Sequence, residues 1–312
     1  MEVGEPHEYG RLIRDKKGNL DRIVEARDAG AKEKRVTLCN SGIMAVRGTL
    51  LFPLLMKLGN KNAKGEYYLT DIVALARKAG HACLVATADA RELQGVNSRR
   101  ELALAEAGMQ ARLRAEAMEN GATLVDPSSV TLCRDTVLGQ DVVVHPHVVF
   151  APGVSVGDHV EIRSFSHIEG AKIDAHAVIG PFARLRPGAV IGKGAHIGNF
   201  VEVKQSVIAP GAKANHLSYI GDAHIGENAN IGAGTITCNY DGFAKHRTVV
   251  GASAFIGSNS SLVAPVTIGE GAIVGAGSVI TEDVDADALA LARGEQKQKA
   301  NWAKAFKNRK RN

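Results

Sequence analysis

The sequence predicts a mainly β protein, in which a small α/β region and a connecting helix precede a long parallel β-helix. Three observations support this prediction. Aliphatic residues recur at about every sixth position through the second half of the chain, aromatic residues make up only 4% of the 312 residues, and one segment of helical composition precedes the repeats. A repeat sustained over many units decides the architecture before local propensities do.

The six-residue repeat fits neither a helix, which repeats at 3.6 residues, nor a flat strand, which repeats at two. Three units would form a triangular coil of roughly eighteen residues, with aliphatic side chains inside and Gly, Asp or Asn at the corners. The repeat is interrupted between Ile236 and Val249, where a loop must leave the coil. The expected inward residues are Leu138, Val144, Phe150, Val156, Ile162, Ile168, Ile173, Ile179, Leu185, Ile191, Ile197, Val203, Ile225, Ile231, Val250, Ile256, Leu262, Ile268, Val274 and Ile280.

Four regions follow in order along the chain. Residues 1–98 form a partial α/β domain, with aliphatic runs typical of strands at 23–24 and 83–86 and a helix over 69–79. Residues 99–121 form a linker helix that Gly121 would end. The β-helix is expected over 122–285. A basic tail over 286–312 begins as a short helix and carries Lys299, Lys304, Lys307, Arg309, Lys310 and Arg311.

Composition excludes several classes of function. No apolar run is long enough to span a membrane, and the N-terminus lacks the profile of a signal peptide, so we expect a cytoplasmic protein. The four scattered cysteines predict reduced thiols, neither a disulfide framework nor a metal site. Much of the net charge of +5 lies in the tail, and without interleaved aromatic residues it indicates solvated surface rather than a nucleic-acid site.

The six-residue repeat resembles the hexapeptide motif of left-handed parallel β-helix acyltransferases. Longer motifs are more specific: GNFVEVK at 198–204, HLSYIGD at 216–222 and NIGAGTITCNYDG at 230–242. Upstream stand GR at 10–11, IVE at 23–25, NSG at 40–42, GEYYLTD at 65–71 and GVNSR at 95–99. From Tyr9 to the basic tail the chain is similar to the family of the bifunctional N-acetylglucosamine-1-phosphate uridyltransferase/glucosamine-1-phosphate N-acetyltransferase.

This resemblance implies a fold and an activity. The fold is a left-handed β-helix that assembles as a homotrimer, with the acetyltransferase site completed by neighbouring chains. The activity is acetyl transfer from acetyl-CoA to the amine of glucosamine 1-phosphate, which supplies UDP-N-acetylglucosamine synthesis for cell-wall peptidoglycan and lipopolysaccharide.

The resemblance also shows what the chain does not carry. The family's glycine-rich phosphate loop, with its Arg and Lys, and the Asp that helps to hold magnesium are absent before Tyr9. Gly10, Glu25, Asn40 and Asn97 match the family's nucleotide-binding positions, and Asn97 its second magnesium ligand. Because magnesium prefers at least one carboxylate oxygen, we expect an incomplete metal site and no uridyl transfer.

The acetyltransferase residues implied by the resemblance fall into three groups. His216 is the general base, since imidazole accepts a proton near neutral pH. The sugar and phosphate contacts are Arg186, Lys204, Tyr219, Asn230 and Lys245. Asn239 is assigned both to catalysis and to the acyl donor. The remaining acetyl-CoA contacts are Ala233, whose backbone N–H is a candidate oxyanion donor, together with Tyr240, Ser258, Ala276 and Arg293.

Two alternatives belong to other classes. Carbonic anhydrases with the same kind of helix hold zinc through a pair of histidines five residues apart and a third, and no two histidines here have that spacing. The chain could instead be an inactive fragment or an assembly scaffold, because half of a sheet domain leaves strand edges unpaired. Solubility and trimer state would distinguish the scaffold from the enzyme.

Overall fold

The computed structural model describes residues 1–90 and 92–309, and the chain divides into two compact units, Met1–Gly108 and Met109–Asn312. The boundary falls inside helix α3 (Arg99–Glu119). This helix confirms the one predicted over 99–121. Gly121, which follows it, has a φ of +99°, a conformation that glycine adopts without steric cost and that ends helices.

The first unit is a small α/β body. Strands β1 (Arg11–Arg14) and β2 (Leu20–Val24) pair in antiparallel fashion. The helices are η1 (Glu33–Arg35), α1 (Gly48–Leu55), η2 (Leu69–Asp71) and α2 (Ile72–Lys78), of which the last two confirm the helix predicted over 69–79. The strand expected at 83–86 was wrong. Cys83 and Val85 pack on the core while Leu84 is 90% exposed, but no strand of the described chain pairs with this extended segment.

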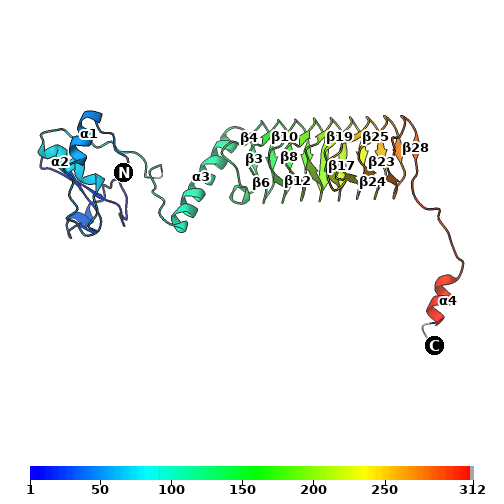
Figure 1. Ribbon diagram of the computed structural model, residues 1–312, viewed down its shortest axis with the longest axis horizontal. Coiled ribbons are helices and arrows are strands. Elements are labelled where there is room, and N and C mark those ends of the chain that lie inside the picture. Colours follow the sequence, from blue (N-terminus) through cyan, green and yellow to red (C-terminus); the bar gives the residue numbers. More distant parts are fainter. Residues whose placement is uncertain (91, 310–312) are drawn as a thin grey trace. The chain divides into compact units, whose positions relative to one another are not determined.

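The second unit is a left-handed parallel β-helix of about 9 turns, which confirms the predicted fold class. Its coils stack along the helix axis from green to orange (Figure 1). The chain runs repeatedly from the first face to the second and then to the third, and each strand hydrogen-bonds to the equivalent strands of the coils before and after it. Residues 17 or 18 apart therefore lie side by side.

The first face contains β4 (Val137–Leu138), β7 (Ser155–Val156), β10 (Lys172–Ile173), β13 (Val190–Ile191), β16 (Val207–Ile208), β19 (Ala223–Ile225), β22 (Thr248–Val250) and β25 (Val266–Ile268). The second contains β3 (Thr123–Leu124), β5 (Val143–Val144), β8 (Glu161–Ile162), β11 (Val178–Ile179), β14 (His196–Asn199), β17 (Lys213–His216), β20 (Asn230–Ile231), β23 (Phe255–Ile256), β26 (Ile273–Val274) and β28 (Leu289–Ala290). The third contains β6 (Val149–Phe150), β9 (His167–Ile168), β12 (Arg184–Leu185), β15 (Glu202–Lys204), β18 (Tyr219–Gly221), β21 (Ile236–Cys238), β24 (Ser261–Val263) and β27 (Val279–Ile280).

The predicted aliphatic residues form the core of this helix. All of them are buried except Leu138, which packs on the core from its first full coil. The repeat also continues where the sequence pattern is less regular, through Ile208, Ala214 and Ile220, all of them buried. At the interruption, Thr237 takes an inward position with 2% of its surface exposed. The loop that leaves the coil spans residues 239–247, between β21 and β22.

The corners differ from the sequence prediction. At the corner between the second and third faces, where Gly, Asp or Asn was expected, three successive coils place Phe165, Phe182 and Phe200. Their φ angles lie between 56° and 63°. Their rings stack at 4.9 and 5.0 Å between centroids. The left-handed conformation costs about 1–2 kcal/mol for a residue with a side chain, and an aromatic pair returns about 0.5–1.5 kcal/mol. Stacking between successive coils therefore offsets much of the strain.

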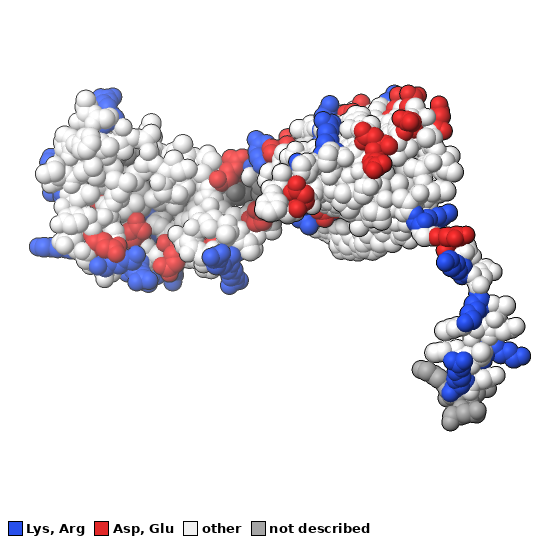
Figure 2. All heavy atoms as spheres, turned by 45° about the vertical axis from the view of Figure 1, so that its right-hand side comes forward, with Lys and Arg blue, Asp and Glu red and all other residues white. Residues whose placement is uncertain are grey.

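The C-terminal end also differs from the sequence prediction. Strand β28 pairs with β26, so the coils continue past residue 285, and helix α4 (Trp302–Arg309) begins later than the helix expected from 286. Lys304, Lys307 and Arg309 give this segment its positive surface (Figure 2). Lys310 and Arg311 lie outside the described residues. Among the described helices, none combines the length and the apolar character that crossing a membrane requires.

Candidate active site

The predicted general base, His216, is the last residue of β17 and is exposed to solvent. Its Nδ1 lies 2.6 Å from Oδ1 of Asn199, the last residue of β14. The two strands pair in parallel with Asn199 opposite His216, so the hydrogen bond joins equivalent positions of successive coils. An imidazole that is held on one nitrogen presents the other nitrogen to solvent.

His216 belongs to a column of equivalent positions, each one residue before the corner between the second and third faces. Going along the helix axis, successive coils place Asn199, His216, Ala233, Ser258 and Ala276 in this column. Backbone hydrogen bonds connect the coils here: the carbonyl of Ala233 accepts from the amide of Asn259 at 2.7 Å, and that of Ser258 from Gly277 at 2.8 Å. The column therefore continues from the base through three of the positions predicted to contact acetyl-CoA.

Arg293 joins the far end of this column. Its guanidinium Nη1 donates to the carbonyl oxygen of Ala276 at 2.8 Å. Within the described chain, the N–H of Ala233 has no hydrogen-bond acceptor, so it is free to donate to a ligand. The structure thus brings four of the predicted acetyl-CoA positions and the base to one corner of the β-helix.

A group of cations lies on the third face, around the corner from His216. Arg186 Nη1 donates to Glu202 Oε1 at 2.8 Å, and Lys204 Nζ lies 3.4 Å from Asp222 Oδ2. The contact with Lys245, and then the charge of Asp222, raises the pKa of Lys204. The contact with Lys204 and the charges of Lys204 and Arg186 lower the pKa of Lys245. Three basic side chains close enough to perturb one another are suited to binding a phosphate dianion.

Loop 239–247 is fixed against this group of cations. The Asn239 side chain, 8% exposed, donates to Asp222 and lies 3.5 Å from the Tyr219 hydroxyl. Tyr240 forms an isolated bridge with Lys245, and its own hydroxyl donates to the carbonyl of Gly242 at 2.6 Å. Asn239, Tyr219 and Lys245 therefore surround one patch of the third face.

Asp241 holds the turn of the same loop. Its Oδ1 accepts from the backbone amides of Ala244 at 2.7 Å and Phe243 at 2.8 Å, and its Oδ2 contacts His246 Nε2 at 2.7 Å. The amide of Ala244, then the imidazole of His246 and the amide of Phe243, hold the pKa of Asp241 far below its ordinary value. The carboxylate therefore stays charged across the range in which enzymes are assayed.

One predicted residue lies apart from these groups. Asn230 begins β20 on the second face, between Lys213 of β17 and Phe255 of β23. It stands at the end of its strand opposite the corner that carries the column. Within one chain, the structure does not bring Asn230 to Tyr219 or to the cations.

Three residues of this region were not predicted as site residues: Asn199, Glu202 and Asp222. Each lies inside a motif that was recognised, and each is 16 to 18 residues from a predicted residue that it contacts. The sequence carried a usable signal, because the length of one coil identifies which residues are neighbours.

The first unit gathers three of the four predicted nucleotide-binding positions. The backbone N–H of Asn40 donates to the carbonyl of Gly10 at 2.8 Å. A methyl group placed on Gly10 would lie 3.5 Å from the Glu25 carboxylate. Glu25 in turn accepts from the Thr70 hydroxyl at 2.8 Å. Asn97 lies beside Gly95, whose amide donates to the Tyr9 hydroxyl at 3.2 Å.

The residues around Asn97 do not fit a magnesium site. Glu101 supplies the nearby carboxylate, but its Oε2 accepts from the amide of Asn97 at 2.7 Å and from the Ser98 hydroxyl at 3.1 Å. These bonds cap the start of α3 and use the carboxylate that a metal would need. In the part of the chain that the structure describes, no group of three or more His, Cys, Asp or Glu side chains is arranged to hold a metal ion.

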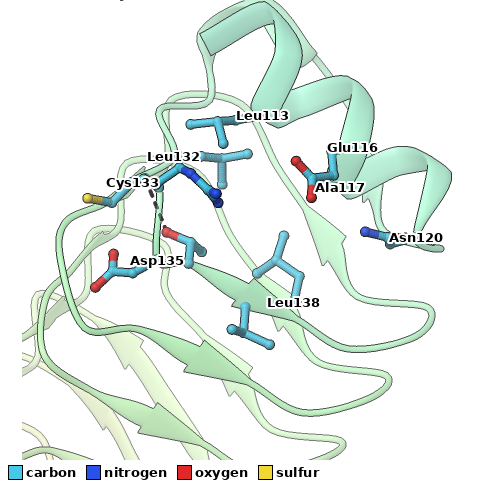
Figure 3. Close-up of a pocket in the computed structure, with 11 residues that line it drawn as sticks. Leu113, Glu116, Ala117, Asn120, Leu132, Cys133, Asp135 and Leu138 are labelled. Atoms are coloured by element: carbon cyan, nitrogen blue, oxygen red, sulfur yellow. Dashed lines mark hydrogen bonds between the residues drawn. The ribbon is translucent and has the colours of Figure 1, made fainter. Parts of the chain in front are cut away.

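A pocket of about 300 Å³ lies between the C-terminal half of α3 and the first coils of the β-helix (Figure 3). Leu113 and Glu116 line it from the helix, and Leu132, Asp135 and Leu138 from the coils. None of the predicted site residues lines this pocket. It is therefore separate from the corner that carries His216.

Comparison with known proteins identifies the family. The sequence model of the protein family described as bacterial transferase hexapeptide (six repeats) matches residues 135–170, 170–205 and 247–282. The bifunctional protein GlmU of Paramagnetospirillum magneticum is 59% identical over 97% of this chain and 67% of its own length. That of Xanthobacter autotrophicus is 59% identical over 98% of this chain and 68% of its own length. Among solved structures, LpxA from Acinetobacter baumannii matches with a TM-score of 0.39 and 17% identity, over 58% of this chain and 76% of that one.

The hexapeptide match and these relatives establish the class of enzyme as well as the fold. The protein is an acyltransferase of the hexapeptide class, and the chain spans about two thirds of the length of the relatives that it matches. Identity of this extent over nearly the whole chain leaves one assignment: the chain belongs to the GlmU family of bifunctional proteins.

Proposed function

We propose that this protein transfers the acetyl group of acetyl-CoA to the amine of glucosamine 1-phosphate, forming N-acetylglucosamine 1-phosphate and CoA. The product would supply the synthesis of UDP-N-acetylglucosamine for the cell wall. The observation that carries the proposal is the meeting of two sites at one corner of the β-helix. A column of small residues ends at an exposed histidine, and a group of three cations begins on the adjoining face.

The group of cations supports the choice of a sugar phosphate. The pKa of Lys245 is lowered because its ammonium group is repelled by the charges of Lys204 and Arg186. A phosphate dianion bound among the three side chains would relieve that repulsion. Tyr219 and Asn239, beside these cations, can hydrogen-bond to sugar hydroxyls. Tyr219 follows His216 by three residues around the corner, so a sugar whose phosphate lies on the cations can place its amine at the imidazole.

The column supports the choice of a CoA thioester. A long, thin molecule can lie along equivalent positions of successive coils where the side chains are small, as they are at Ala233, Ser258 and Ala276. Arg293, fixed to Ala276, would meet the phosphates of CoA, and Tyr240 the pantetheine arm near the acyl group.

The reaction that these groups would perform is a direct transfer. His216 Nε2 takes a proton from the substrate amine as the nitrogen attacks the carbonyl carbon of the thioester. A tetrahedral oxyanion forms and accepts a hydrogen bond from the N–H of Ala233, while Asn239 holds the acyl donor beside the sugar. The C–S bond then breaks, and the CoA thiolate leaves and takes the proton from His216. One N–C bond forms, one C–S bond breaks, and the base is regenerated.

We further propose a homotrimer. The position of Asn230, on a different edge of the β-helix from Tyr219, supports this assembly, because a neighbouring copy could bring its Asn230 to the sugar site. We also propose that the 312-residue chain does not transfer uridyl groups by itself. The carboxylate nearest to Asn97 caps a helix and is used by the hydrogen bonds that it accepts there.

The test is the release of CoA from acetyl-CoA in the presence of glucosamine 1-phosphate, measured with a thiol reagent, alongside a UTP-dependent pyrophosphate assay. His216→Ala should abolish CoA release, and His176→Ala, an exposed histidine stacked at the opposite corner, should retain it. No CoA release from a soluble wild-type trimer would refute the proposal and favour the scaffold. Pyrophosphate formation would refute the absence of uridyl transfer.

A further inference from the structure

The contact between Asn199 and His216 is close and is built into the coil register. Asn199 is half-buried and His216 is exposed, and their side chains meet at 2.6 Å from opposite positions on paired strands. The residue before Asn199 is Gly198. A methyl group there would lie 2.7 Å from Cα of Asn215, the neighbour of His216. The coils therefore approach closely at this position, and glycine permits it.

We propose that Asn199 is a positioning residue that keeps His216 in the tautomer protonated on Nδ1, so that Nε2 carries the lone pair for catalysis. This inference rests on the proposed role of His216 as the base. The Oδ1 atom of an amide can only accept a hydrogen bond, so its partner on the imidazole must be an N–H. A neutral imidazole with Nδ1–H has its lone pair on Nε2.

An amide suits this role in both states of the base. When His216 has taken a proton from the substrate amine, Nδ1–H remains the donor and the same bond persists. Asn199 therefore fixes the ring through the whole cycle without a charge that would hold the proton on Nε2. A carboxylate at the same place would favour the imidazolium and delay return of the proton to the CoA thiolate.

Other ionisable groups around this pair are few. On the same strands they are His196 of β14 and Lys213 of β17, both three residues before the pair and opposite each other, and β20 carries none. Glu202 of β15 and Tyr219 of β18 follow around the corner. The bond from Asn199 is the contact made directly to the ring in the described structure.

Nuclear magnetic resonance of the ¹⁵N-histidine-labelled 312-residue chain tests the tautomer without any substrate, with the His216 signal assigned from its loss in His216→Ala. The wild-type ring should show a protonated Nδ1 and an unprotonated Nε2. Asn199→Ala should show a mixture of both tautomers. A wild-type His216 protonated mainly on Nε2 would overturn the proposal. This readout stands even when no CoA is released, so its failure is distinguishable from failure of the proposed function.

Kinetics give the second test. Asn199→Ala should lower kcat by roughly tenfold, the factor for one lost neutral hydrogen bond, with KM for glucosamine 1-phosphate within about twofold. Asn199→Asp, which keeps the shape and the acceptor, should instead shift the acidic limb of the kcat–pH profile to higher pH. Ser164→Ala is the matched control, because Ser164 holds the equivalent position two coils earlier. Equal kcat values for Asn199→Ala and Ser164→Ala, or an unshifted profile for Asn199→Asp, would overturn the proposal.

Discussion

Gly198→Ala should slow the enzyme by moving two coils apart. The added Cβ would lie against the backbone of Asn215, with the carbonyl oxygen closest, the carbonyl carbon at 2.6 Å and Cα at 2.7 Å. These atoms belong to the main chain of the next coil, so no side-chain rotation can relieve the contact. The neighbouring strands β14 and β17 must separate where Asn199 meets His216.

The structure sets the size of this effect. Carbon atoms pack at about 3.5 Å or more, and the carbonyl carbon of Asn215 would lie at 2.6 Å, so the strands must separate by roughly 0.9 Å at this position. Added to the 2.6 Å between Asn199 and His216, that movement brings their contact to roughly 3.5 Å, beyond the usual range of about 2.7–3.2 Å for such a bond. Forcing extra volume into a packed interior costs about 1–3 kcal/mol of stability. We therefore expect kcat to fall roughly tenfold together with a measurable loss of stability.

The assay combines initial rates of CoA release with thermal unfolding. The matched control is Gly157→Ala, whose Cβ would lie 2.8 Å from the backbone nitrogen of Ala175, at the corner between the first and second faces and not at the corner that carries His216. It should lose stability to a similar degree and keep its kcat within about twofold. If both variants lose stability while Gly198→Ala keeps the wild-type kcat, the reasoning about coil separation is wrong.

Three further predictions concern the third face and its loop. Lys245→Ala should raise KM for glucosamine 1-phosphate roughly tenfold in initial-rate measurements. Because the pKa of Lys245 is lowered, the wild-type KM should begin to rise at a pH below the ordinary lysine pKa of about 10.4, as this side chain loses its proton, and the variant should lack this rise. Asp241→Asn should raise KM by the same factor at every assayed pH. The pKa of Asp241 is lowered, so the charge of this carboxylate stabilises the loop fully above the ordinary pKa of 3.8, and that stabilisation is lost only when the pH falls through the lowered pKa. Thr237→Val should lower stability to urea by about 1–3 kcal/mol, because its hydroxyl is the acceptor for the buried amide of Gly221 at 2.8 Å; wild-type stability in this variant would contradict the assignment.

Much of the β-helix could be predicted from the sequence because one physical requirement repeats. Each coil must fill a narrow core, so Ile179, Ile197 and their equivalents are aliphatic at a fixed spacing. The same spacing places residues of neighbouring coils beside one another. Coil length alone would have paired Asn199 with His216 and Lys204 with Asp222, so the contacts of the candidate site were within reach of the sequence pattern.

The features that were wrong or missed depend on partners that no local pattern reveals. Phe182 and Phe200 occupy a strained corner where their rings stack on each other across successive coils. The run at 83–86 has the composition of a strand, but a strand also needs a neighbour to pair with. Leu289 and Ala290 read as tail by composition, yet the unpaired edge of β26 offers them backbone hydrogen bonds.

The stacking of the coils has a consequence for how this enzyme can change. Each coil touches only its immediate neighbours, so the free energy of folding approximates a sum over adjacent pairs. The candidate site occupies only the coils between Arg186 and Arg293. Coils before Arg186 could be gained or lost during evolution, or in engineering, without altering the spacing of any reacting group. Insertion of a single coil between His216 and Ser258 would separate the proposed base from the proposed acyl-donor site. The first coils of the solenoid are thus free to vary in number, whereas the later coils are not.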